Sequence, residues 1–137
     1  MHSLLKNLPH EGPMLFLDDV EEVSWSTIRT RTTFGPDFLM VHEGAVSPLV
    51  VLELFAQSAA ALMAHRQAKT DRPDVSGFLL GARKLDVHVD AFAVGDVVRT
   101  EAEEKWGAGA LAQFDCRCFL GDRLVAEGAI NVAAGSL

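Results

Sequence analysis

A stretch of twenty residues near the middle of the chain constrains the fold more than any other feature. Residues 47–66 read SPLVVLELFAQSAAALMAHR, which is apolar around the whole circumference of a helix. A helix of this kind has to be buried on every side, so the remainder of the chain must wrap around it. Both ends are marked, because Ser47 can cap the first turn, Pro48 suits a helix start and Arg66 complements the dipole at the carboxyl end. We therefore predict one long central helix.

Glu53 and Gln57 are polar side chains inside this apolar helix, and their i, i+4 spacing places them on one face. Apolar surroundings remove hydration from a charged carboxylate, which raises its pKa and lets it hold a proton near neutral pH. Two interpretations stay open. Glu53 carries acid–base chemistry, which we prefer because unpaired buried glutamate is rare, or it is structural and bonds to a backbone amide or to a partner subunit.

Length and charge bound the class of protein. At 137 residues and 49% hydrophobic content, the chain is long enough for one domain with a real core and too short for two, so residues 1–137 are expected to form a single domain. The net charge of −7 argues against a general affinity for nucleic acid or anionic membranes. The N-terminal residues lack the basic flank and long apolar core of a signal peptide, so we expect a cytoplasmic protein.

The cysteine and histidine patterns predict neither a disulfide nor a metal site. Cys116 and Cys118 lie two residues apart on a predicted strand, where they share a face but are too close to form an ordinary disulfide. We expect them to be core thiols. The five histidines, which are His2, His10, His42, His65 and His88, show no metal-ligand spacing.

The N-terminal part of the chain shows patterns typical of strands and turns. A short helix is expected at residues 4–8, and residues 14–20 look like the start of an apolar strand. Residues 24–34 are rich in β-branched residues and alternate in polarity, which predicts a long, half-solvated strand. Residues 35–46 have a loop-like composition and lead directly into the helix.

The C-terminal part shows further strand patterns. Residues 77–90 begin as a continuous apolar run and then alternate, so we expect their first half to be buried against the helix. Residues 97–106 alternate with charges on one face, which predicts a solvated sheet surface. Residues 110–120 and 123–133 are predicted to form a hairpin around a Gly-Asp turn.

Together these elements predict an α+β fold in which a strongly curved antiparallel sheet envelops one long helix with its apolar face. Such a sheet leaves edge strands that need cover, and pairing two copies edge to edge would provide it. We expect a dimer at least.

Three motifs follow one another in the chain: LPHEGPMLFLDDV at residues 8–20, PLVVLELFAQSAAAL at 48–62 and GFLLGARKLDVHVDAFAVGD at 77–96. In this order they resemble the opening motif LPHRxPxLLxDxV, the PGVLxxEAMAQ helix, and the strand with its PGD turn of the hotdog-fold 3-hydroxyacyl-[acyl-carrier-protein] dehydratases of fatty acid synthesis. The chain is most similar to the small dehydratase-like proteins of bacterial aryl-polyene pigment clusters, which carry LPHxxPMxxLDxV, an ExxAQ helix and a GFLLGxR strand.

The resemblance implies a hotdog fold in a homodimer or in a heterodimer with a related subunit, acting without a cofactor on an acyl chain tethered to an acyl carrier protein. The active site would lie between subunits, with a histidine from the loop before the helix of one and the helix acid of the other. By position, Glu53 matches the acid and His42 is the candidate base. Dehydration of a 3-hydroxyacyl thioester needs such a pair, together with a dipole that stabilises charge on the thioester oxygen.

The resemblance also indicates substrate-binding positions. The amides of Leu49 and Val50, at the start of the helix, would stabilise the thioester oxygen. Gln57 would orient Glu53, and the strand from Phe78 to Leu80 would line the acyl tunnel together with the helix. The predicted substrate-binding residues are His10, Leu49, Gln57, Phe78 and Leu80.

The chain departs from the family pattern at two positions. The family histidine lies fourteen residues before the acid, whereas His42 lies eleven before Glu53. Either the loop is three residues shorter or His42 is not the equivalent residue. In addition, a family glycine whose amide helps to hold the thioester carbonyl falls on Pro48, which has no N–H.

Three functions are therefore compatible with the sequence. The first is a dehydratase that acts on carrier-bound acyl chains. The second is a catalytically silent hotdog subunit that stabilises or positions an active dehydratase, which Pro48 and the shortened loop favour. The third is an acyl thioesterase on the same fold, in which Glu53 would activate water.

Overall fold

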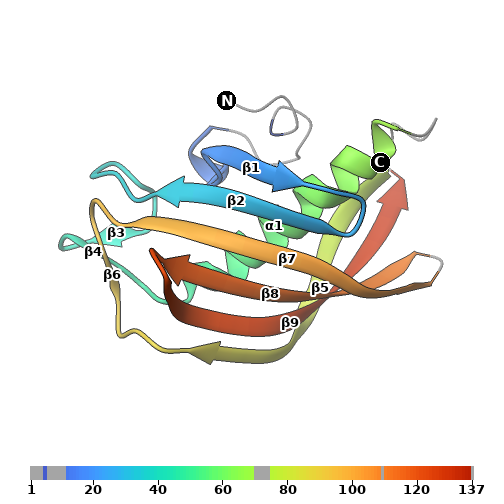
Figure 1. Cartoon of the computed structure of the whole chain (residues 1–137). Coiled ribbons are helices and arrows are strands. Elements are labelled where there is room, and N and C mark those ends of the chain that lie inside the picture. The colour runs from blue at the N-terminus through green and yellow to red at the C-terminus, as the bar shows by residue number, and fades with distance from the viewer. Residues whose placement is uncertain (1–4, 6–11, 70–74, 109, 137) are drawn as a thin grey trace.

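The helix α1 (Val50–Gln67) lies against a curved six-stranded antiparallel sheet in this computed structural model, which describes residues 5, 12–69, 75–108 and 110–136 (Figure 1). The strands follow the order β1-β2-β7-β8-β9-β5 across the sheet. Their bounds are β1 Asp19–Val23, β2 Thr27–Thr33, β7 Val97–Ala108, β8 Leu111–Leu120, β9 Arg123–Ser136 and β5 Val75–Val87. The predicted α+β architecture, a curved sheet wrapped around one helix, is confirmed.

A second, smaller sheet lies beside the start of the helix (Figure 1). It contains β3 (Val41–His42), β4 (Ala45–Val46) and β6 (Phe92–Ala93), in the order β3-β4-β6. The segment 35–46 that was expected to be a loop therefore includes a short hairpin. Its turn residues, Glu43 and Gly44, both have positive φ (52° and 77°), as a tight two-residue hairpin turn requires.

Most of the circumference of α1 is buried, as predicted. Val50, Leu54, Phe55 and Leu62 are fully buried against the sheet. A stripe along the remaining face stays partly exposed, and it consists of Leu52, Glu53, Ala56, Met63 and Ala64. We call these residues the open stripe of α1. One sheet covers one side of a helix, so the open stripe is the face that a second protein would have to cover.

The segment from Met14 to Val20 does not begin as a strand, and this prediction was wrong. Residues Gly12–Met14 form a short 3-10 helix, and β1 starts only at Asp19. The physical reason lies in α1, because the Gln57 side chain bonds to the backbone of this segment and takes the place of a neighbouring strand. The expected helix at residues 4–8 lies outside the described residues, apart from Leu5.

The predicted long strand over residues 24–34 is shorter than expected. It begins at Thr27, because Ser24 turns the chain between β1 and β2. The Ser24 hydroxyl accepts a hydrogen bond from the Thr27 amide (3.2 Å) and lies 2.7 Å from the Thr27 hydroxyl, which closes this turn.

Leu79 and Leu80, in the apolar run of β5, are not buried against the helix, and the prediction was wrong for these two residues. The side chains of residues 75–78 lie outside what the structure describes. β5 is one of the two edge strands of the sheet, β1 being the other, and it pairs only with β9 in the part of the chain that the structure describes. Leu79 and Leu80 are exposed, whereas Leu85 and Val87 further along the strand are half-buried and pack against the core. Edge position, which depends on the order of strands, decides the exposure of these leucines.

The β8–β9 hairpin forms around Gly121 and Asp122 as predicted, with Leu120 opposite Arg123. The inward side chains of β8 are buried, and they are Ala112, Phe114, Cys116 and Cys118. Ala110, which was expected to be the first residue of this strand, is exposed in the turn before it.

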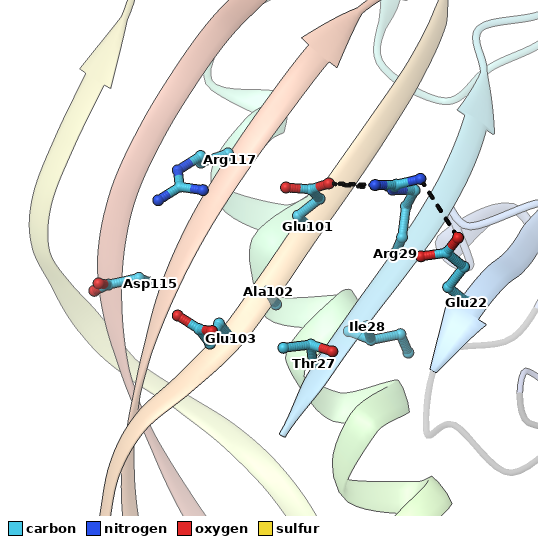
Figure 2. Close-up of a pocket in the computed structure, with 9 residues that line it drawn as sticks. All are labelled: Glu22, Thr27, Ile28, Arg29, Glu101, Ala102, Glu103, Asp115 and Arg117. Atoms are coloured by element: carbon cyan, nitrogen blue, oxygen red, sulfur yellow. Dashed lines mark hydrogen bonds and ion pairs between the residues drawn. The ribbon is translucent and has the colours of Figure 1, made fainter. Parts of the chain in front are cut away.

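The outer face of the sheet carries paired charges, as the alternating pattern predicted. Arg29 lies between Glu101, at 2.8 Å, and Glu22, at 3.8 Å, beside a shallow hollow of about 240 Å³ (Figure 2). The hydrogen bonds that Arg29 donates to the Glu101 carboxylate raise the pKa of Arg29 above its ordinary value. This face is a network of ion pairs exposed to solvent, each of which contributes little to stability.

Candidate active site

Gln57 links the central helix to the N-terminal segment. Its side chain is fully buried, and Oε1 accepts a hydrogen bond of 2.8 Å from the Phe16 amide. Nε2 donates to the Met14 carbonyl (2.8 Å) and to Glu53 Oε1 (3.0 Å). Both N–H donors of the amide are therefore used inside the chain. Gln57, predicted as a substrate-binding residue, is placed so that it orients the Glu53 carboxyl group.

Glu53 lies on the open stripe of α1 and is half-buried. Its neighbours on the stripe, Leu52 and Ala56, are apolar, and Gln57 holds one of its carboxyl oxygens from one turn further along the helix. A carboxyl group held this way has a fixed direction at the border between the core and the open face. This geometry suits a group that exchanges a proton with a molecule bound against the helix.

A chain of aromatic rings fixes the segments next to this pair. The rings of Phe16 and Phe38 lie 4.7 Å apart, those of Phe38 and Phe34 4.9 Å, and those of Phe34 and Phe92 5.3 Å. They join the segment after the 3-10 helix, the loop after β2 and strand β6. Sequence analysis missed this cluster, although phenylalanines on both sides of Gly35 and Pro36 indicate a loop that returns to the core.

His42 lies at the end of β3, next to the tight β3–β4 turn. Its side chain is 89% exposed, and Nε2 lies 4.0 Å from a carboxylate oxygen of the neighbouring Glu43. The imidazole thus points into solvent at the tip of a hairpin and is not enclosed together with Glu53. The structure of the single chain leaves this predicted base accessible to a second protein.

The start of α1 uses its amides within the chain. The Leu49 amide donates to the Ser47 hydroxyl (3.3 Å) and the Val50 amide to the Ser47 carbonyl (3.1 Å), while Pro48 has no N–H. The helix therefore begins at Val50, three residues later than predicted. The two amides that were expected to stabilise a thioester oxygen are already bonded, and the Leu49 side chain is exposed.

Among the remaining predicted positions, Leu80 is the one whose side chain the structure describes. Leu80 is 60% exposed on the edge strand β5, where it borders a hollow on the outer face of the sheet. Phe78 pairs through its backbone with Ala133, and its side chain lies outside what the structure describes. His10 lies outside the described residues. The roles of these three residues stay predictions.

The cysteines of β8 are free thiols inside the core. Burial raises the pKa of Cys118 to about 12, and burial raises the pKa of Cys116 still further. Thiols in this state are not nucleophiles at neutral pH. Among the described residues, no group of three or more His, Cys, Asp or Glu side chains is arranged to hold a metal ion. No described helix is long and apolar enough to span a membrane.

The fold and the acid on the helix define the structural class of this protein. A curved antiparallel sheet around one long helix is the hotdog fold, here with a glutamate and a glutamine one turn apart on the helix. The family model of ApeP-like proteins, described as ApeP dehydratase, matches residues 2–136. The chain therefore belongs to the ApeP-like dehydratase family, which confirms the resemblance seen in the sequence.

Solved structures share the fold at low sequence identity. The chain is similar to the dehydratase heterocomplex ApeI:P from Xenorhabdus doucetiae, with a TM-score of 0.92 and 21% identity over 99% of this chain and 93% of that one. It is also similar to a sigma28-regulated virulence protein from Campylobacter jejuni, with a TM-score of 0.70 and 14% identity over 96% and 95% of the two chains. It is similar as well to a hypothetical thioesterase with coenzyme A from Streptococcus pneumoniae, with a TM-score of 0.65 and 12% identity over 86% of this chain and 85% of that one. No protein with a curated description matches the sequence.

Proposed function

We propose that this chain is a subunit of a dehydratase that removes water from a 3-hydroxyacyl thioester on an acyl carrier protein, giving the trans-2-enoyl thioester, in aryl-polyene biosynthesis. Membership of the ApeP-like dehydratase family supports the reaction class. The observation that carries the proposal is Glu53, which Gln57 holds at 3.0 Å on the open stripe of α1. A cytoplasmic location remains our expectation.

The chemistry assigns a separate role to each group. A base removes the α-proton of the thioester, and the electron pair left on that carbon forms the new double bond as the bond to the hydroxyl breaks. Protonated Glu53 gives its proton to the departing hydroxyl, which leaves as water. His42 is the candidate base. Because its imidazole is exposed at the β3–β4 tip, we place it opposite the Glu53 of a second subunit.

A catalytically silent subunit is the second candidate function, and the start of α1 favours it. Pro48 has no N–H, and the amides of Leu49 and Val50 are bonded to Ser47. Such a helix start offers a substrate oxygen no free donor from these positions, so charge on a thioester oxygen would need stabilisation from a partner. The heterocomplex of the solved relative suggests a related hotdog subunit as this partner.

Mass spectrometry of a carrier-bound 3-hydroxyacyl substrate separates these functions. Loss of one water with the pure protein supports an active dehydratase, whereas release of the acyl group identifies a thioesterase and contradicts our proposal. If product forms only after a second dehydratase-like hotdog protein is added, the chain acts as part of a heterodimer.

Glu53→Gln tests the acid in whichever assembly is active. Gln at this position can still accept the hydrogen bond from Gln57, so the fold should be retained while the deliverable proton is lost. We expect dehydration to slow by about 10²–10⁴-fold. Glu22→Gln, which removes a carboxylate that is 72% exposed on the outer face of the sheet, is the matched control and should keep full activity. An active pair that tolerates Glu53→Gln would assign the chemistry to the partner and leave this chain as the silent subunit.

A further inference from the structure

A second hollow lies on the outer face of the sheet, away from the helix. Gln113 and Asn131, which border it, are neighbours on β8 and β9 and alternate with the buried residues Phe114 and Ile130, so they point outward. Trp106 lies opposite Gln113 on β7. The hollow has a volume of about 550 Å³, which is within the range of small-molecule sites.

Three large apolar side chains border this hollow beside its polar ones, and all three are exposed. Leu80 is 60% exposed, Trp106 52% and Leu111 47%. They come from three different strands, β5, β7 and β8, and meet around one depression. Large exposed apolar side chains grouped in this way indicate a binding surface, whereas single ones are ordinary.

Arg83 provides the charge of the site. It stands at a β-bulge of β5 and reaches across β9 to donate a hydrogen bond of 2.9 Å to Gln113 Oε1. No carboxylate among the described residues lies within ion-pair distance of its guanidinium, and one of its five N–H donors is used there. In the hollow of Figure 2, by contrast, the arginine already has counter-charges, because Arg29 is paired with Glu101 and Glu22.

We propose that this outer hollow binds an organic carboxylate with an apolar aliphatic or aryl body. The leucines and the indole would cover the body, and Arg83 would bond to the carboxylate. A neutral apolar molecule would leave the charge of the guanidinium without a counter-charge, and a cation would be repelled by it. This site is separate from Glu53, which lies on α1 on the other side of the sheet, and it does not depend on the proposed dehydration.

Tryptophan fluorescence gives a direct test, because the chain has two tryptophans and Trp25→Phe leaves Trp106 as the sole reporter. Octanoate and phenylpropionate are titrated into the full-length Trp25→Phe protein, with octanol as the neutral control. We expect a saturable change of the Trp106 emission with one or both carboxylates, and binding of octanol at least about tenfold weaker than that of octanoate. The carboxylate that binds more tightly shows whether the hollow prefers an aliphatic or an aryl body.

Arginine variants test the role of the charge. Arg83→Gln should weaken carboxylate binding at least about tenfold, because a charge-assisted hydrogen bond is lost. Arg117→Gln, which removes an exposed arginine from the same face of β8, should bind as the parent protein does. Equal binding of octanol, or an unchanged affinity of Arg83→Gln, would overturn the proposal. Trp106 emission that stays unchanged on titration with both carboxylates would also overturn it.

Discussion

Cys116 and Cys118 illustrate at the scale of single residues how burial alone sets chemistry. Both side chains point from β8 into the core, and the Thr100 hydroxyl lies 3.3 Å from the sulfur of Cys118. Removal of water from around a thiolate is unfavourable, so each thiol keeps its proton far above its ordinary pKa of 9.0. The prediction of core thiols from their spacing is confirmed.

These raised pKa values predict a loss of stability at alkaline pH. Above pH 9 the thiols of the unfolded chain lose protons that the folded chain keeps, so the free energy of unfolding falls as the pH rises towards the folded pKa values. Each thiol should lower the free energy of unfolding by about 1.4 kcal/mol per pH unit in this window, and it should cause no pH dependence below pH 9. Urea unfolding between pH 8 and pH 11 measures the slope.

The double variant with Cys116→Ala and Cys118→Ala is the control for this slope. It retains every lysine, and the chain has no tyrosine. The two proteins therefore differ only in their thiols among the groups that titrate in this pH range. Its free energy of unfolding should fall less steeply above pH 9. Parallel slopes for the two proteins would show that the thiols do not account for the alkaline loss.

At the scale of elements, the pairing of β5 with β9 is irregular and depends on a glycine. β5 carries bulges between Leu79 and Gly81 and between Ala82 and Lys84. The second bulge brings the Lys84 carbonyl against Gly128 of β9 so closely that an added Cβ would lie far inside van der Waals contact of the oxygen. Gly128 therefore permits the close approach of the two strands, as glycines in strands often do.

Gly128→Ala should accordingly destabilise the protein by about 1–3 kcal/mol, because the backbone of β5 would have to move. Gly81→Ala is a matched control from the same strand pair, since a Cβ there meets nothing within 4 Å. The control should change the free energy of unfolding by less than about 1 kcal/mol. Thermal and urea unfolding of both variants measure the difference, and equal effects would contradict the close approach.

Other elements show what the sequence alone could predict. α1 was expected over residues 47–66 and spans Val50–Gln67. This prediction succeeded because a helix that is apolar on all sides can be recognised from consecutive residues. The β8–β9 hairpin followed from local alternation and its turn. The conformation after Met14 depends on the hydrogen bonds of Gln57, and the exposure of Leu79 and Leu80 depends on the order of the strands. Both are contacts distant in sequence, which local patterns do not contain.

The candidate site divides in the same way. Glu53 and Gln57 were found because their i, i+4 spacing forces them onto one face, and the structure joins them by a hydrogen bond. Ser47 was expected to cap the first turn, and its hydroxyl does accept a hydrogen bond from the Leu49 amide. That the Val50 amide bonds to the Ser47 carbonyl, and that the helix begins only at Val50, was not predicted, because both depend on the detailed conformation of the first helical turn. Whether His42 acts with Glu53 depends on a second subunit, which one sequence does not specify.

At the scale of the whole molecule, two uncovered surfaces of the described chain bear on its association with a partner. One is the open stripe of α1, and the other is the outer edge of β5, whose backbone groups face away from β9 (Figure 1). An uncovered strand edge next to a partly apolar helix face favours association with another sheet of the same kind. We therefore expect a dimer, either of this chain or with a related hotdog subunit, in which the exposed His42 of one subunit can approach the Glu53 of the other.

Ala56→Glu tests this expectation, because Ala56 lies in the middle of the open stripe and is partly exposed. The longer side chain should be tolerated by the single chain, whereas a charge in the contact with a partner would be desolvated, so we expect the dimer affinity to fall by at least about tenfold. Sedimentation velocity of this chain, alone and mixed with a related subunit, measures the association. Ala110→Glu, which places the same charge in the exposed turn before β8, should associate as the parent protein does. A parent chain that sediments as a monomer in both samples would contradict the dimer, and with it the placing of His42 and Glu53 in one site.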